Sequence, residues 1–250
     1  MKITVIGGTG LVGRQLVERL RNQGHEVIAA ARSTGVNIVT GEGLAEAIEG
    51  ARIVIDASNS GYARADDMTH FFADAGRRLL SAEREAGVAH HVALSAIGTN
   101  QLNGGYFAAK KAQEELVRDS GLGFTIVRST PFFEFIYKIV DAGGEGDRVR
   151  VPPIQMRPIG SADVATALAE IALELPASGM VEVVGPDQRA LPDLALQILT
   201  ANEDSRGIIV DPEALYFEAR FEGEPLVGGE QPHKAPIDFE SWLRAWIASA

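Results

Sequence analysis

A short apolar run that leads directly into spaced glycines constrains the fold of this chain more than any other feature. Residues 2–6 (KITVI) have the length and composition of a buried strand, and Gly8, Gly10 and Gly13 follow as GxGxxG. A helical pattern of apolar residues, 11–23, begins inside this motif. In such a strand–turn–helix unit the glycines permit a tight turn, close approach of the backbone to a pyrophosphate, and close packing of helix on strand.

This arrangement predicts a dinucleotide site, with the phosphates at the N-terminal end of the helix, where free N–H groups and the helix dipole attract anions. The residues expected to contact the cofactor in this turn are Gly7, Thr9, Gly10, Leu11, Val12 and Gly13. Ala57, Ser58 and Asn59 come at the end of a later strand pattern and are expected to border the same cofactor. Residues 61–67 are expected to form a loop over it.

Apolar strand patterns alternate with helical patterns along the first half of the chain, which is typical of a parallel sheet covered by helices on both faces. Strands are predicted at residues 2–6, 26–31, 53–57, 90–95 and 124–127, with a weaker one at 37–39. Helices are predicted at residues 11–23, 44–48, 66–86 and 107–119. The predicted fold class is therefore α/β, a doubly wound parallel sheet of the Rossmann type.

Beyond residue 131 the alternation loosens, and a small C-terminal α/β lobe is expected. The segments predicted here are a helix at 132–141, a glycine-rich break at 143–146, a helix at 161–174 and a strand at 181–184. We expect residues 1–131 to form the dinucleotide-binding core and residues 132–250 to form mainly a substrate-binding lobe. Segments at about 155–185 are expected to return to the core.

The composition indicates a large apolar core and no disulfides. Hydrophobic residues make up 46% of the 250 residues, there is no cysteine, and no apolar run approaches the roughly 18 residues that span a bilayer. No signal-like segment precedes the first strand pattern. The net charge of -11 is spread along the chain, so its field repels nucleic acid. We expect a cytoplasmic enzyme, monomeric or homodimeric, without a metal and without nucleic-acid or membrane partners.

The end of the second predicted strand distinguishes between the two common dinucleotides. An NAD site places a carboxylate about 20 residues past the glycines, where it accepts from the ribose 2′-hydroxyl. This chain instead has Arg32 and Ser33 there, and a guanidinium is well shaped to hold a 2′-phosphate. The sequence therefore favours NADP(H), although an arginine after a strand is also common as a plain solvated residue.

A Tyr-x-x-x-Lys pair, Tyr106 and Lys110, heads the helix predicted after the strand at 90–95. Spacing of four places both side chains on one helix face. A phenol with a pKa near 10 needs a nearby cation to act in proton transfer at neutral pH, and Lys110 is placed to supply it. Ser95 ends the preceding strand. We therefore predict that Tyr106 protonates a carbonyl oxygen and that Ser95 hydrogen-bonds the same oxygen; the alternative is a half-buried tyrosine beside a solvated lysine.

Aromatic residues follow the strand at 124–127 and are candidates for a substrate pocket. Pro131 and Phe132 are expected at the nicotinamide end of the cofactor, and the residues expected to line the substrate pocket are Ile97, Phe132, Phe133 and Phe135. Ordinary packing of the lobe would explain these aromatic residues equally well. His90 and His91 are adjacent in a strand, so they point to opposite faces and cannot chelate one metal together.

At these motifs the chain resembles the short-chain dehydrogenase/reductase superfamily, and more closely its atypical, NmrA-like NAD(P)-binding branch. The similar segments are 7–13 (GGTGLVG), 92–98 (VALSAIG), Tyr106 with Lys110 and 114–116 (EEL), 124–134 (FTIVRSTPFFE) and 159–165 (IGSADVA). The resemblance covers about residues 1–185. It implies a catalytic triad of Ser95, Tyr106 and Lys110, with Lys110 also binding the nicotinamide ribose.

Two departures from the catalytic members of that superfamily keep alternatives open. The asparagine that completes their catalytic tetrad is not identifiable in this sequence, and many NmrA-like members serve as redox sensors or regulatory partners. The favoured hypothesis is an NADPH-dependent oxidoreductase that reduces a carbonyl, quinone or enone of a small hydrophobic substrate. The alternatives are a non-catalytic NADP(H)-binding sensor and an epimerase or dehydratase acting on a sugar nucleotide, for which the second lobe is small.

Overall fold

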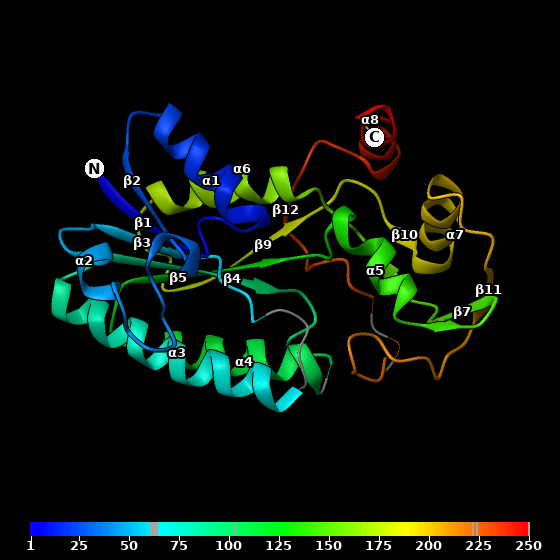
Figure 1. Cartoon of the computed structure of the whole chain (residues 1–250), viewed down its shortest axis with the longest axis horizontal. Helices are drawn as coiled ribbons and strands as arrows, with labels where there is room; N and C mark the ends of the chain where they lie inside the picture. Colours follow the sequence, from blue (N-terminus) through cyan, green and yellow to red (C-terminus); the bar gives the residue numbers. More distant parts are fainter. Residues whose placement is uncertain (61–64, 103, 222, 224, 250) are drawn as a thin grey trace.

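A single sheet of parallel strands forms the centre of the molecule (Figure 1). The computed structural model describes residues 1–60, 65–102, 104–221, 223 and 225–249. Seven strands lie in the order β2–β1–β3–β4–β5–β9–β12, and every neighbouring pair is parallel. The strands are β1 (Lys2–Ile6), β2 (Glu26–Ala30), β3 (Ile53–Asp56), β4 (His90–Ala96), β5 (Phe124–Ser129), β9 (Gly179–Val184) and β12 (His233–Lys234).

Helices cover both faces of this sheet, which confirms the doubly wound fold. Helices α1 (Leu11–Asn22) and α6 (Ser161–Leu173) pack together on one face, while α3 (Ala65–Ala86) and α4 (Gly105–Arg118) pack on the other (Figure 1). The short α2 (Leu44–Ile48) packs against α3. The inner strands are buried on both sides, with Ile3, Val5 and Ile55 fully inaccessible, so they read as continuous apolar runs rather than alternating ones.

Two predicted elements differ from the structure, and in both cases hydrogen bonding explains the difference. Residues 37–39 form a turn and not a strand, because the Asn37 side chain accepts from the backbone N–H of Val39 and its carbonyl accepts from Gly41. The helix predicted from 132 begins only at α5 (Ile136–Asp141), after a 3₁₀ turn η2 (Phe133–Phe135). Phe132 stays extended there because it is bridged to Ile159, whose carbonyl accepts from Phe133 N–H.

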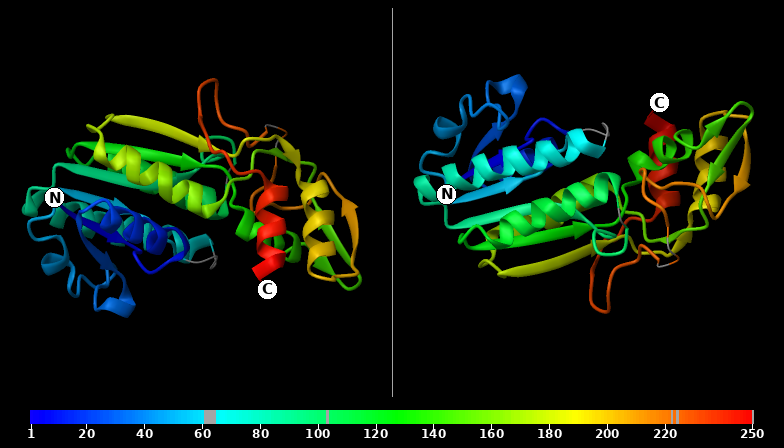
Figure 2. Two further views of the ribbon diagram at one scale, coloured as in Figure 1. Left: turned by 90° about the horizontal axis from the view of Figure 1, so that it is seen from above. Right: turned by 90° about the horizontal axis from the view of Figure 1, so that it is seen from below.

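The C-terminal part of the chain builds a lobe at one end of the sheet, beyond β4 and β5 (Figure 2). Its remaining elements are β6 (Gly144–Glu145), β7 (Arg148–Val151), β8 (Gln155–Met156), β10 (Arg189–Ala190), α7 (Leu191–Ala201), β11 (Gly207–Val210) and α8 (Phe239–Ser249). The glycine-rich segment 143–146, predicted as a break, includes β6, which pairs with β7. The α6 helix and β9, by contrast, pack into the central sheet.

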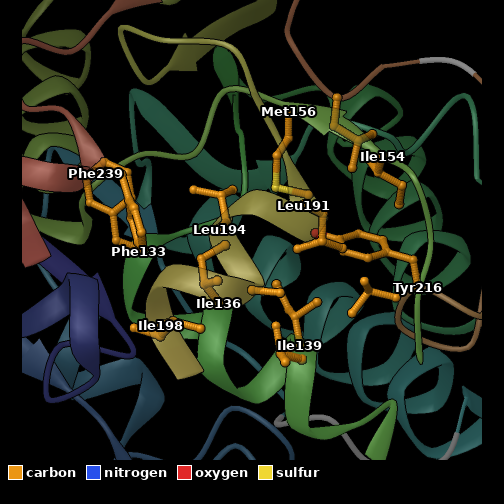
Figure 3. Close-up of a cluster of buried hydrophobic side chains, with 14 of the residues drawn as sticks. Phe133, Ile136, Ile139, Ile154, Met156, Leu191, Leu194, Ile198, Tyr216 and Phe239 are labelled. Carbon is orange, nitrogen blue, oxygen red and sulfur yellow. The ribbon is translucent and has the colours of Figure 1, made fainter. Parts of the chain in front are cut away.

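Side chains from α5, η2, α7 and α8 give this lobe a core of its own (Figure 3). Phe133, Ile136, Leu191 and Leu194 are fully buried or within 1% of it. The same cluster continues through Tyr216, Phe107 and Ile97 to the end of β4, so the lobe is packed firmly against the strand ends. Within the part of the chain that the structure describes, no helix is both long and apolar enough to cross a membrane.

Candidate active site

A pocket of about 820 Å³ lies at the carboxyl ends of the parallel strands, between the sheet and the lobe. Its wall is built from the segments that follow five consecutive strands of the sheet, β2, β1, β3, β4 and β5. Ligands of open α/β sheets bind at this edge, where the strand order reverses. The loop residues 61–64, expected to cover this region, lie outside the described residues.

The glycine turn has the geometry that the sequence motif predicts. Gly7 has φ +74°, and a Cβ on Gly13 would lie 2.1 Å from the Gly7 carbonyl oxygen, so helix α1 is pressed against the turn. At Gly10 a Cβ would meet only the Gly7 oxygen at 3.2 Å, and the residue lines the pocket. Gly10 is the N-cap of α1 and no side chain caps this helix start. The turn therefore leaves room and N–H donors for a pyrophosphate.

The adenosine end of the pocket is formed by residues that follow β2. Arg32 and Ser33 begin the 3₁₀ turn η1 (Arg32–Thr34), line the pocket, and are exposed. The Ser33 hydroxyl lies 3.2 Å from that of Thr9 and so links η1 to the glycine turn. The Arg32 guanidinium makes no hydrogen bond or ion pair within the described residues, which leaves its donors available to a ligand.

Tyr106 and Lys110 lie together on the pocket-facing side of α4, as the spacing predicts. The Lys110 ammonium is 5.9 Å from the centre of the Tyr106 ring and 4.2 Å from that of Phe72. It donates to the Leu94 carbonyl at 3.0 Å and to Gln113 Oε1 at 2.9 Å. Burial lowers the pKa of Lys110 from 10.5 to about 8, although the carboxylates of Asp56 and Glu114 oppose this shift. The Lys110 ammonium is therefore buried and fixed by hydrogen bonds, and it is not solvated.

Ser95 lines the pocket, and its hydroxyl is hydrogen-bonded to a buried carboxylate of the protein. The Oγ–H donates to Glu114 Oε1 at 2.6 Å, and Glu114 also accepts from Arg128 Nε at 2.7 Å and Arg128 Nη2 at 2.6 Å. Burial alone raises the pKa of Glu114, yet the bonds from Arg128 and Ser95 lower it overall, so it is a buried carboxylate. Since a serine has one proton to donate, Ser95 cannot make this bond and donate to a substrate oxygen at the same time.

Aromatic side chains surround the far end of the pocket, beyond Tyr106. Phe132 and Phe135 are stacked with ring centres 5.5 Å apart. The ring centres of Phe217 and Tyr106 are 6.1 Å apart. Ile97 also lines this end. Phe133, expected beside them, instead lies in the core of the lobe: it is 1% exposed and packs on Phe239 and Trp242. The cause is the 3₁₀ turn, which directs its ring away from Phe132 and Phe135.

The pocket also includes residues that were not predicted to line it. These are chiefly Val36, Asn37, Ile38 and Val39 near Arg32, Phe71 on α3, Ser129 and Thr130 after β5, and Ile139, Tyr216 and Phe217 from the lobe. The hydroxyls of Thr130 and Ser58 are buried and have no hydrogen-bond partner among the described residues. Buried polar atoms normally have partners, so both indicate places for polar groups of a ligand. Thr130 directly precedes Pro131, which was predicted to contact the cofactor, and this neighbourhood is the signal in the sequence that could have identified Thr130 as a pocket residue.

The fold and the pocket define a dinucleotide-binding protein of the Rossmann type. A family model described as NAD(P)H-binding matches residues 7–174, and the chain belongs to this family. The match confirms the resemblance to atypical short-chain dehydrogenases/reductases and confirms an NAD(P)H cofactor. The glycine turn, Arg32, Ser58 and Lys110 fit such a group, because they supply backbone donors, a cation for phosphate and buried hydroxyl and ammonium donors along one pocket.

Several known proteins are similar to this chain. The photosystem II assembly factor Ycf39 of Synechocystis is 29% identical over 152 residues, 54% of this chain and 46% of that protein. A (4-alkanoyl-5-oxo-2,5-dihydrofuran-3-yl)methyl phosphate reductase of Streptomyces griseus is 31% identical over 144 residues, 52% and 48% of the two chains. The chain thus spans about half the length of these curated relatives.

The fold is also similar to that of solved structures. The structure of dTDP-4-dehydrorhamnose reductase from Bacillus anthracis in complex with NADP superposes with a TM-score of 0.72. The superposition covers 100% of this chain and 99% of that chain at 16% sequence identity. At this identity the likeness shows a common fold and no more.

Proposed function

We propose that the protein is an NADPH-dependent oxidoreductase that reduces a carbonyl, quinone or enone group of a small hydrophobic substrate. One observation carries this proposal: a single pocket joins the glycine turn and Arg32 at one end to Tyr106, Lys110 and an aromatic wall at the other. The similarity to the Streptomyces reductase supports the same class of reaction. Residues 132–250 are proposed to supply much of the substrate wall.

The side chains divide the proposed work between them. Arg32 holds a 2′-phosphate and the N-terminal end of α1 holds the pyrophosphate. The bound dinucleotide supplies a hydride to the substrate. Tyr106 donates its phenolic proton to the substrate oxygen, and the Lys110 charge stabilises the phenolate that remains. Ser95 is a supporting residue in this proposal, since its proton is committed to Glu114.

The lining of the pocket favours an uncharged substrate. Among the described residues that line it, the only charged side chains are Arg32, assigned to the cofactor, and Lys110. A nucleotide-sugar substrate would bring two further phosphates into the aromatic end, where the described residues supply no guanidinium or second ammonium to bind them. The alternative of an epimerase or dehydratase acting on a sugar nucleotide is therefore disfavoured.

Within the site, the hydrogen bond from Ser95 to Glu114 favours a non-catalytic sensor, because it removes a second donor from the substrate oxygen. Turnover decides between the two functions. We expect the protein to oxidise NADPH with at least one member of a panel of quinones, aromatic ketones and aldehydes. Absence of turnover across the panel, with NADPH binding intact by calorimetry, would favour the sensor.

The Tyr106→Phe variant tests the chemical assignment. It keeps the ring and its packing on Phe107 and Phe217 but removes the proton, so NADPH affinity should persist while turnover falls by about 10²–10⁴. Tyr137→Phe is the matched control, because Tyr137 donates to Asp204 in the lobe and does not line the pocket. If Tyr106→Phe retains most of the wild-type rate, another residue must supply the proton.

A further inference from the structure

The ammonium of Lys110 is connected to a buried carboxylate through a neutral side chain. Gln113 lies one turn further along α4 and accepts from Lys110 Nζ at 2.9 Å. Its amide nitrogen donates to Asp56 Oδ2 at 2.8 Å, and Asp56 Oδ1 accepts from the Ser58 N–H at 2.9 Å. Lys110, Gln113 and Asp56 are all at most 4% exposed.

Only one orientation of the Gln113 amide satisfies both neighbours. Its carbonyl must face the ammonium, which only donates, and its NH₂ must face the carboxylate, which only accepts. A flipped amide would oppose donor to donor and acceptor to acceptor. The cation and the anion therefore fix the amide, and the amide in turn fixes the position of the ammonium beside the Tyr106 ring.

We infer that Gln113 and Asp56 are positioning residues of the proposed reaction. The Asp56 carboxylate attracts the Lys110 ammonium and, through the Gln113 amide, holds it beside Tyr106 without forming an ion pair with it. The inference rests on the proposed function for its kinetic consequence only. The asparagine that completes the tetrad of the catalytic short-chain enzymes is not identifiable in this sequence. The support of Lys110 is assigned to Gln113 and Asp56 instead.

The spacer has an electrostatic consequence. A carboxylate in direct contact would form an ion pair with Lys110 and raise the pKa of the ammonium. With an amide between them, burial dominates and the pKa of Lys110 is about 8. The lysine is thus charged at neutral pH, and among the described residues no carboxylate forms an ion pair with it that would weaken its effect on the Tyr106 phenol.

Among the described residues, few other groups face Lys110. Glu114 on the same helix is held by Arg128, Arg118 and Ser95. On α3 the neighbour is the uncharged ring of Phe72, and on β4 it is the Leu94 carbonyl. The buried His91–Glu83 pair is close enough to Asp56 for the Asp56 charge to push the pKa of both groups upward, and neither group is hydrogen-bonded to Lys110.

The direct test measures the pKa of Lys110 by NMR in the protein without cofactor or substrate, using lysine labelled with ¹³C at Cε. The chain has five lysines, and the Lys110 signal is identified by its loss in Lys110→Met. In Gln113→Met the pKa should fall by about one pH unit, because one hydrogen bond to the charged form is lost. Asp56→Asn should also lower it, and the effects of the two substitutions should not add.

Gln113→Glu is the conservative variant and guards against misfolding of the others. If the carboxyl introduced at this position is protonated, it keeps both hydrogen bonds, to Lys110 and to Asp56. If it is ionised, it attracts the ammonium. In both cases the pKa of Lys110 should stay at the wild-type value or rise. Gln23→Met, at an exposed position at the end of α1, is the matched control. An unchanged Lys110 pKa in folded Gln113→Met and Asp56→Asn overturns the inference, whether or not any substrate is found.

A kinetic arm becomes available once a substrate is known. The alkaline limb of the kcat–pH profile should lie near pH 8 and move to lower pH in Gln113→Met, with KM little changed. A fall of kcat at all pH values with no movement of the limb would show a merely structural role.

Discussion

Replacing Ser95 by alanine separates a catalytic serine from a supporting one. The side chain is 3% exposed and its hydroxyl donates to Glu114 at 2.6 Å. In Ser95→Ala the carboxylate loses this bond but keeps two from Arg128 and one from Arg118. A hydrogen bond to a charged group contributes about 1.5–3 kcal/mol, so with Glu114 still satisfied the loss should be at the lower end, about 1.5–2 kcal/mol.

Urea unfolding followed by circular dichroism measures this loss, with Ser81→Ala as control. Ser81 is on α3, and its hydroxyl makes only a long 3.4 Å hydrogen bond, to Glu85, among the described residues. The control should therefore change stability by less than about 0.5 kcal/mol. Turnover of Ser95→Ala should fall by less than about tenfold (about 1.4 kcal/mol). A fall of 10² or more with unchanged stability would refute the argument, because it would show that the hydroxyl leaves Glu114 and reaches the substrate.

The further predictions concern the cofactor site and the core. Calorimetry should show at least tenfold tighter binding of NADP(H) than of NAD(H), about 1.4 kcal/mol, and Arg32→Ala should abolish that preference; equal affinities in the wild type would refute it. Gly10→Asp should fold but lose both dinucleotides, whereas Gly13→Ala should be destabilised by about 1–3 kcal/mol in urea, since its Cβ would lie 2.1 Å from the Gly7 oxygen. Burial lowers the pKa of His91, yet Glu83 outweighs this and raises it. The contribution of protonated His91 to the free energy of unfolding is therefore complete below about pH 6.5 and is lost as the pH rises through the pKa of His91 in the folded protein. That downward slope, at most about 1.4 kcal/mol per pH unit, should flatten in His91→Gln.

Much of the fold followed from local pattern. The strands at 2–6, 53–57 and 90–95 were predicted to within a residue or so because inner strands of a parallel sheet are apolar throughout. The strand predicted at 37–39 failed because the Asn37 side chain competes for the backbone N–H of Val39. The helix predicted from 132 began late because Ile159, 27 residues further on, holds Phe132 extended.

Within the candidate site, the sequence by itself determined the features whose partners are near in the chain. The glycine turn depends on residues 7–13, and Tyr106 and Lys110 share a helix face because four residues make about one turn. Only the tertiary structure decided which groups Ser95 and Lys110 bind. Glu114 on the next helix accepts a hydrogen bond from Ser95 and is itself held by Arg128 on the next strand. Asp56 is 57 residues from the Gln113 that holds Lys110. Hydrogen bonds of this kind depend on how strands and helices are placed across the sheet, so no spacing in the sequence can reveal them.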